Sequence, residues 1–190
     1  MKVDVIENTP GSVRFILKGS GFNFANALRR VVMNSVECFA VDSVTFYENS
    51  TAMFDEYIAH RIGMLPILTP KGYNEKDEIL FSLTAEGPSI VYSKDMVGSD
   101  KYVKVANDNI PIIKLSTGQK LRLDAKAIMN KGSKSAKFQP GLATYKANEK
   151  GDEFEFYIET FGQMQAMEIL TRALEVIKNE VKDISKELKK

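Results

Sequence analysis

The single histidine and the single cysteine are the side chains of this chain best suited to acid–base or nucleophilic chemistry. His60 follows Glu56 by four residues in the segment FDEYIAHRIGMLP, so a helix would place both side chains on one face. Such a pair can transfer protons, but the same spacing also suits a local contact that only orients the ring. Cys38 follows the first expected helix, whose C-terminal dipole disfavours a thiolate. We therefore interpret His60 and Glu56 as a local structural pair, and Cys38 as a small buried side chain.

The sequence lacks the residues that a typical metal site or nucleotide-binding site needs. A structural zinc or an iron–sulfur cluster takes about four cysteine or histidine ligands, and this chain has one of each. The GSG at residues 19–21 has neither the third glycine nor the acidic residue of a dinucleotide fingerprint, and a turn before a helix explains it. We therefore expect no cofactor, no metal and no catalytic residue. A carboxylate-based site of a small metabolic enzyme stays open as a hypothesis.

The charge balance argues against nucleic acid as the main ligand. Lysine and arginine total 26, and aspartate and glutamate total 25, whereas proteins that grip phosphate backbones usually have a basic excess. The basic segment KGSKSAKFQPG at 131–141 could touch phosphate, but a solvated loop is the simpler interpretation. No apolar run has the ~20 residues of a membrane span, and MKVDVIENTP lacks the apolar core of a signal peptide. We expect a cytoplasmic protein with no membrane contact and no direct nucleic-acid contact.

Patterning predicts that each end of the chain contributes strands and one amphipathic helix. Alternating apolar residues indicate strands over 2–6, 13–18 and 153–159. A first helix is expected from about Phe24 to Glu37, after Asn23 as its N-cap. The middle of the chain contains short β-like runs separated by turn-rich loops. We therefore interpret the middle as an insertion into a domain that the two ends form together.

Arg29 and Arg30 stand side by side in the first expected helix, among small apolar residues. Small residues let two helices approach closely, and guanidinium groups offer several donors to carboxylates or carbonyl oxygens. The pattern NFANALRRVV therefore favours a contact with another protein. A solvated helix flank is the alternative.

The last helix, expected from about Gln163 to the C-terminus, carries an apolar seam with alternating steps of three and four residues. The seam consists of Met167, Leu170, Leu174, Ile177, Val181, Ile184 and Leu188. A heptad seam is typical of a helix that packs against another helix. We expect the distal part to project and to meet a partner. The alternative is that the whole helix packs on its own sheet.

Two long motifs resemble a known family. FANALRRVVMNSVECFAVDSV and FDEYIAHRIGMLPI are similar to the alpha-type assembly subunits of cellular RNA polymerases, and more to the archaeal and eukaryotic branch than to the bacterial one. Shorter segments agree along nearly the whole chain: VYSKDMV, IPIIKLSTGQKLRLDAKA, AKFQP and FYIETFGQM. On this resemblance we expect an assembly subunit of the archaeal type designated D.

The resemblance implies an α+β fold in two domains. A dimerisation domain of strands and two helices would be formed by residues 1–38 and 152–190, and a β-rich insert domain by residues 39–151. In the family this subunit has no catalytic site. It pairs with the small subunit L, and the pair docks the two large catalytic subunits of the nucleotidyltransferase and, in archaea, the small subunits N and P.

Carried onto this sequence, the family's contacts fall on the two helices and on the second motif. Subunit L is expected to contact Phe24, Leu28, Val31, Met167, Leu170, Leu174, Ile177 and Val181. The large-subunit interface is expected to include Arg29, Arg30, Glu56, His60 and Arg61.

Two departures from the family bear on function. Many archaeal relatives carry a cysteine-rich, ferredoxin-like insertion near the end of the middle domain, but Cys38 is the only cysteine here, so we expect no iron–sulfur cluster. Ser135 stands where we expect the family to have histidine before AKFQP, so a role of that histidine is not carried over. A self-associating homodimer, like the N-terminal part of the bacterial alpha subunit, is the alternative to pairing with subunit L.

Overall fold

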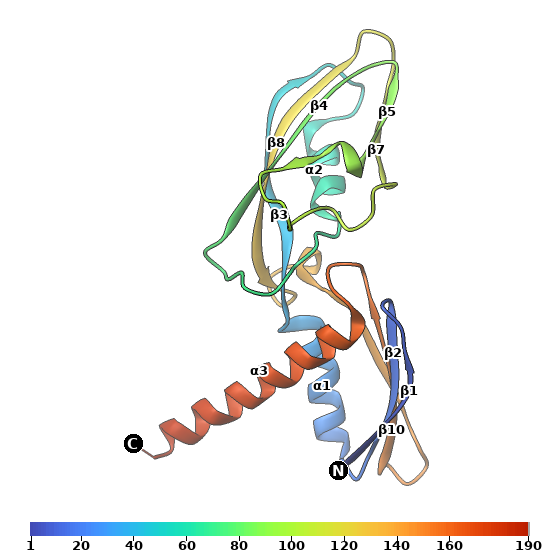
Figure 1. Ribbon diagram of the computed structural model, residues 1–190, viewed down its shortest axis with the longest axis vertical. Coiled ribbons are helices and arrows are strands. Elements are labelled where there is room, and N and C mark those ends of the chain that lie inside the picture. Colours follow the sequence, from blue (N-terminus) through green and yellow to red (C-terminus); the bar gives the residue numbers. More distant parts are fainter. Residues whose placement is uncertain (190) are drawn as a thin grey trace. The chain divides into compact units, whose positions relative to one another are not determined.

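The computed structural model describes residues 1–189, and the chain forms two compact units. The first unit consists of Met1–Glu37 and Lys131–Lys190, and the second of Cys38–Asn130. In Figure 1 the blue segment and the orange-to-red segment, which come from opposite ends of the chain, lie together in the first unit. The second unit is therefore an insertion into the chain of the first.

The first unit is built on an antiparallel sheet with strand order β1-β2-β10-β9. Its strands are β1 (Lys2–Asn8), β2 (Ser12–Lys18), β9 (Gly141–Ala147) and β10 (Glu153–Thr160). Because side chains alternate between the two faces of a strand, β2 and β10 turn a set of apolar residues to one face. All of these are buried: Val13, Phe15, Leu17, Phe154, Phe156 and Ile158.

Two helices cover this apolar face. α1 (Phe22–Asn34) packs on β9, and α3 (Ala166–Glu187) packs on β10 and β2. The helices also pack on each other, and small buried residues such as Ala25 and Ala173 allow a close approach. The first unit is thus one sheet and one helix layer around a shared core.

The second unit is β-rich. Its larger sheet has the order β3-β8-β4-β6, formed by β3 (Glu37–Asn49), β8 (Lys120–Lys131), β4 (Glu78–Glu86) and β6 (Val97–Gly98). A two-stranded sheet pairs β5 (Ser89–Tyr92) with β7 (Pro111–Leu115). α2 (Asp55–Gly63) packs against β7.

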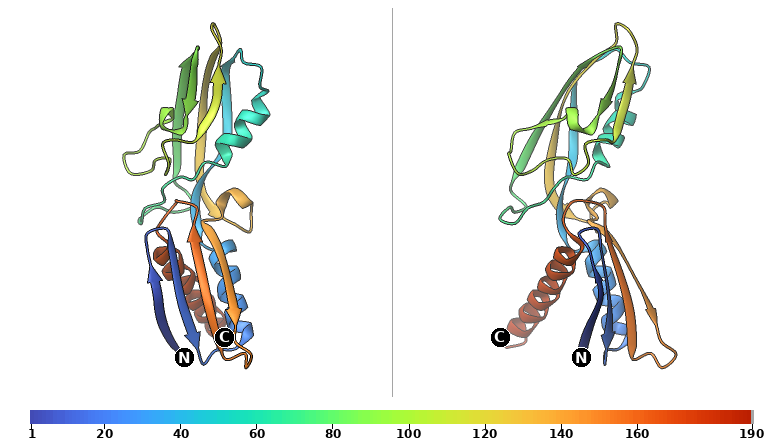
Figure 2. Two further views of the ribbon diagram at one scale, coloured as in Figure 1. Left: turned by 90° about the vertical axis from the view of Figure 1, so that its right-hand side faces the viewer. Right: turned by 45° about the vertical axis from the view of Figure 1, so that its right-hand side comes forward.

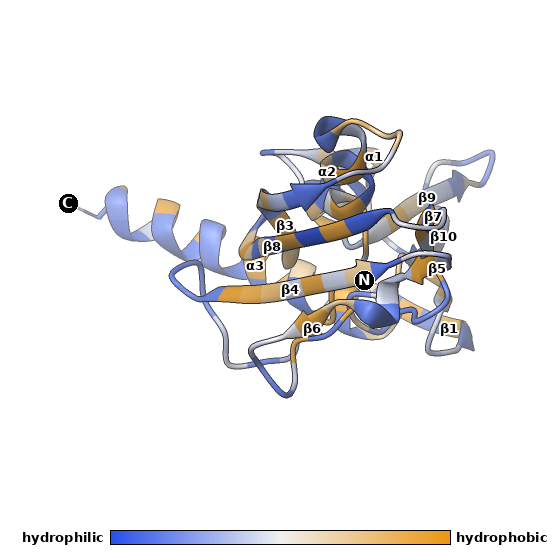
Figure 3. Cartoon of the chain, turned by 90° about the horizontal axis from the view of Figure 1, so that it is seen from above, coloured by the Kyte–Doolittle hydropathy of each residue, from blue (hydrophilic) through white to orange (hydrophobic). Residues whose placement is uncertain are grey.

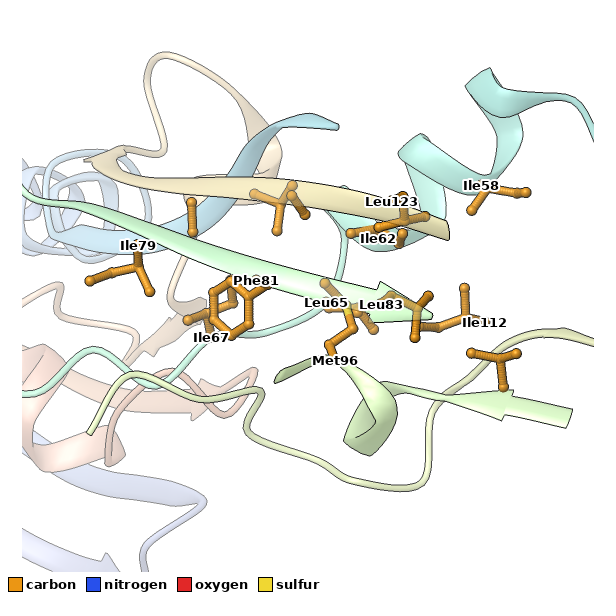
Figure 4. Packing of buried hydrophobic residues seen from close by; sticks show 14 of the residues in the cluster. Ile58, Ile62, Leu65, Ile67, Ile79, Phe81, Leu83, Met96, Ile112 and Leu123 are labelled. Atoms are coloured by element: carbon orange, nitrogen blue, oxygen red, sulfur yellow. The ribbon is translucent and has the colours of Figure 1, made fainter. Parts of the chain in front are cut away.

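The second unit has a hydrophobic core of its own. Alternate residues of β8 are apolar, which Figure 3 shows as bands of colour along the strand, and these residues are buried. In Figure 4 Ile62 of α2 lies beside Leu123 of β8, and Leu65, Leu83 and Met96 lie together. The insert therefore has its own source of stability.

The predicted α+β class is confirmed, but the predicted boundaries differ from the structure. β9, expected within the insert, belongs to the first unit because it pairs with β10 along its whole length. The second boundary consequently falls at Lys131 and not at residue 152. α1 ends at Asn34, and Glu37, expected within the helix, begins β3. The alternation in LATYKA predicts a strand but does not reveal which strand it pairs with.

We expect Gly141→Ala to lower the free energy of unfolding by about 1–3 kcal/mol, because close-packed backbone would have to move. A Cβ at Gly141 would collide with the backbone oxygen of Glu159 on the paired strand β10. Gly11→Ala is the control, since a Cβ there meets nothing within 4 Å, and it should change the value by less than about 0.5 kcal/mol. Urea denaturation followed by circular dichroism measures both, and equal stabilities of the two variants would contradict the prediction.

Candidate protein-docking surface

α3 belongs to the core of its unit only in its N-terminal part. The residues buried there are Ala166, Ile169, Leu170 and Ala173. Farther along, the apolar seam is exposed: Leu174, Val181, Ile184 and Leu188 are 43%, 58%, 61% and 82% accessible to solvent. Figure 2 shows the reason, because α3 diverges from the sheet of its own unit toward the C-terminus. The alternative that the whole helix packs on its own sheet is therefore wrong.

The charged residues of α3 lie off this seam. Glu168 and Arg172 form an ion pair at 2.7 Å in the N-terminal part, and Asp183 and Lys186 form one at 2.8 Å in the distal part. Such pairs at spacings of three or four residues support a helix modestly and leave its apolar face unchanged. The distal part of α3 is thus an amphipathic helix whose apolar side has no cover within its own unit.

The partner contacts that we predicted divide into three groups. Leu28 and Leu170 are buried within their own unit, so little of either side chain is left for a partner. Leu174 and Val181 are exposed. The half-buried residues are Phe24, Val31, Met167 and Ile177. The heptad spacing alone cannot separate these groups, because it does not show where α3 leaves the sheet.

The arginine pair lies on the flank of α1. The Nη2 atom of Arg29 donates to Oδ1 of Asn26 at 3.0 Å, so this side chain is held along the helix. Arg30 is exposed, and its side chain forms no hydrogen bond or ion pair within residues 1–189. Its guanidinium group is therefore available to a carboxylate or a carbonyl oxygen of another chain.

The segment after α1 is tied to the basic loop. The backbone N–H of Ser133 donates to the backbone oxygen of Asn34 at 3.0 Å, which satisfies a carbonyl at the C-terminal end of α1. Lys131 pairs with Glu37 at 3.2 Å, and the Nζ atom of Lys137 lies 5.2 Å from the ring centroid of Phe138. This loop therefore supports the end of a helix, and two of its lysines already have partners in their own unit.

The side-chain contacts of the second motif, FDEYIAHRIGMLPI, differ from those that we predicted. Glu56 and His60 lie on α2 and are exposed, but within the described residues they form no hydrogen bond or ion pair with each other, so the expected local pair is wrong. Arg61 donates from Nη2 to the backbone oxygen of Pro111 at 2.6 Å and so links α2 to β7. The prediction that Cys38 is buried is confirmed.

Several exposed apolar residues escaped the sequence analysis. Phe54 and Tyr57, at the start of α2, are exposed and border an apolar pocket of about 610 Å³. In the first unit, Val3 and Val5 of β1 are exposed although they alternate like core residues. Alternation identified β1 as a strand, but the sequence has no signal for which strands the helices would leave uncovered.

The part of the chain that the structure describes contains no group of three or more histidine, cysteine, aspartate or glutamate side chains placed to hold a metal ion. Nor does any described helix combine the length and the apolar character needed to cross a membrane.

The chain is similar to known proteins of one family. Residues 44–144 match the family model of the RNA polymerase Rpb3/RpoA insert domain. The chain is 43% identical over 166 residues to DNA-directed RNA polymerase subunit Rpo3 of Methanocaldococcus jannaschii, which covers 87% of this chain and 85% of the relative. It is 47% identical over 153 residues to subunit Rpo3 of Pyrococcus furiosus, which covers 77% of this chain and 59% of the relative.

The names of these relatives correct our expectation about the subunit type, and their lengths show how much of them the chain covers. We expected an assembly subunit of the type designated D, but the matching relatives from Pyrococcus, Methanocaldococcus and Halobacterium carry the designation Rpo3. The chain spans about three fifths of the length of the Pyrococcus and Thermococcus relatives. Both the match across the insert and the identity along most of the Methanocaldococcus relative lead to one conclusion: the chain belongs to the Rpo3 family of DNA-directed RNA polymerase subunits.

Proposed function

We propose that this chain is a non-catalytic assembly subunit of an archaeal DNA-directed RNA polymerase. It pairs with the small subunit L through α1 and the distal part of α3, and the pair forms the platform on which the large catalytic subunits of this nucleotidyltransferase dock. The observation that carries the proposal is the exposed apolar seam of α3, from Leu174 to Leu188. The complex acts in the cytoplasm.

The seam supports pairing because its exposure is unfavourable in water. Fully burying a leucine, isoleucine or valine side chain contributes roughly 1.5–3 kcal/mol, so a partner that covers the exposed positions gains several kcal/mol from the seam. The heptad spacing suits a second helix, whose side chains can interlock with those of the seam. A helix that only needed to close its own core would end near Ala173, where its burial ends.

The charges beside the seam favour a different chain over a second copy. Glu180 and Glu187 lie one heptad apart on the same flank of the seam. In a two-fold pair of antiparallel α3 helices this flank would meet itself, and like charges would face each other. A different chain can present basic residues there, so we do not favour the homodimer of the bacterial alpha type.

The large subunits are expected to dock on polar and aromatic surface outside the seam. Arg30 supports this assignment because its side chain is exposed and has no partner among residues 1–189, and Arg29 lies beside it. On the second unit, Glu56 and His60 are exposed on α2, the helix whose Tyr57 lines the apolar pocket, while Arg61 is hydrogen-bonded to the backbone of Pro111. We further propose that the small subunits N and P bind the assembled platform, with no direct contact of this chain to nucleic acid.

We expect Leu174→Asp to abolish pairing with subunit L, because a carboxylate buried without a partner costs several kcal/mol and weakens association at least a hundredfold. Asn179→Asp is the control, since it adds the same side chain to an exposed position of α3 off the seam. Co-expression followed by size-exclusion chromatography measures the yield of the pair. A normal yield with Leu174→Asp would refute the seam as the pairing surface.

We expect Arg30→Ala to leave pairing with subunit L intact and to reduce recruitment of the large subunits about tenfold, since hydrogen bonds to charged groups contribute roughly 1.5–3 kcal/mol. Arg122→Ala, an exposed arginine that lies over the ring of Tyr47 in the second unit, is the control. Reconstitution from purified subunits, with the assembled polymerase quantified on a native gel, separates the two steps. If both variants assembled equally well, Arg30 would be a solvated flank residue.

A further inference from the structure

Strand β1 exposes apolar side chains on the face of the sheet that elsewhere carries the core. It forms one edge of the sheet and pairs only with β2, and all of its residues are exposed. Val3 pairs with Leu17 and Val5 with Phe15. Directly opposed residues of an antiparallel pair project to the same face, and both Leu17 and Phe15 are buried there. Val3 and Val5 nevertheless remain 54% and 56% exposed.

The other face of β1 is already matched with its neighbour. The Nζ atom of Lys18 lies 3.0 Å from Oδ2 of Asp4, and this hydrogen bond raises the pKa of Lys18. Asp4 lies between Val3 and Val5 and, by alternation, on the opposite face. On its outer face β1 is thus tied to β2 by an ion pair, whereas Val3 and Val5 on its inner face stay exposed to solvent.

The inner face is uncovered because the helix layer of the first unit is incomplete. α1 packs on β9, and α3 packs on β10 and β2 before it diverges from the sheet, as the right view of Figure 2 shows. The divergence therefore exposes two apolar surfaces of one unit: the seam of α3 and the inner face of β1. A sheet face of this kind is normally completed by another helix in the same layer, next to α3.

We propose that the inner face of β1 is a second wall of the pairing surface, and that one helix of the smaller partner chain packs against Val3 and Val5 while it also contacts the α3 seam. This inference rests on the proposed function, because the same partner covers both surfaces. Apolar side chains that stay exposed on a sheet face favour association, and a partner helix over the inner face would remove Val3 and Val5 from water.

Thiol protection tests the contact directly. Val3→Cys places a thiol on the inner face and Asp4→Cys places one on the outer face of the same strand, while the native Cys38 is fully buried and gives little background. Each variant is labelled with a fluorescent maleimide, alone and as the purified pair with the small subunit. We expect pairing to slow labelling of Val3→Cys at least tenfold and of Asp4→Cys less than twofold. Equal labelling of Val3→Cys with and without the partner overturns the inference.

Affinity provides the second measurement. We expect Val3→Asp and Val5→Asp each to weaken pairing at least tenfold, because a carboxylate would enter an apolar contact, and Lys2→Asp, on the outer face, to change it less than threefold. Val3 and Val5 are exposed in the isolated chain, so circular dichroism should show unchanged folding.

The outcome with Leu174→Asp separates the two proposals. If Leu174→Asp abolishes pairing while Val3→Asp and Val5→Asp leave it unchanged, the inference about β1 is wrong and the proposed function stands. If none of the three weakens pairing, the proposed function itself fails. Protection of Val3→Cys in the isolated chain at high concentration would mean that a second copy covers β1, which also overturns the inference.

Discussion

α3 extends beyond the core on which it rests, and this constraint shapes the first unit. Its N-terminal part contributes to the shared core through Ile169, Leu170 and Ala173. Past Ala173 the helix diverges from the sheet, so its apolar side chains face water, as do those of β1. Hydrophobic burial is the main favourable term in folding and in most association. The apolar surface that stays exposed supports the proposal that another protein completes this core.

The insert differs from the first unit in this respect. Its core is closed by α2, two sheets and the loops between them, and contains fully buried large side chains such as Phe39 and Phe81. It exposes single apolar side chains on several elements, such as Tyr47, Leu80 and Tyr102, and the neighbouring pair Phe54 and Tyr57 at the start of α2, beside a pocket. The first unit thus leaves apolar side chains next to its core exposed to solvent, whereas the core of the second unit is closed. Residues 44–144, which match the insert-domain family model, cover most of this second body and extend into β9.

Within the described residues, the side chains most suited to chemistry do not come together in one site. Cys38 is buried, and Arg61 donates to the backbone of Pro111. His60 and Glu56 are both exposed and do not contact each other in the described residues. An i, i+4 spacing brings two side chains within reach, but in water an exposed pair gains little from meeting, so the spacing alone was a poor guide to contact.

The sequence by itself determined the class of the fold and the amphipathic nature of α3, because these depend on local periodicity. Long motifs such as FDEYIAHRIGMLPI indicated an RNA polymerase subunit, but the designation D that we expected from them was wrong. Only the tertiary structure decided which parts of each pattern are buried. It assigned β9 to the first unit by pairing it with β10, buried Leu28 and Leu170, and left Leu174, Val3 and Val5 in water. The physical reason is that periodicity identifies an apolar face, whereas burial depends on where distant elements end and which of them lie close enough to cover it.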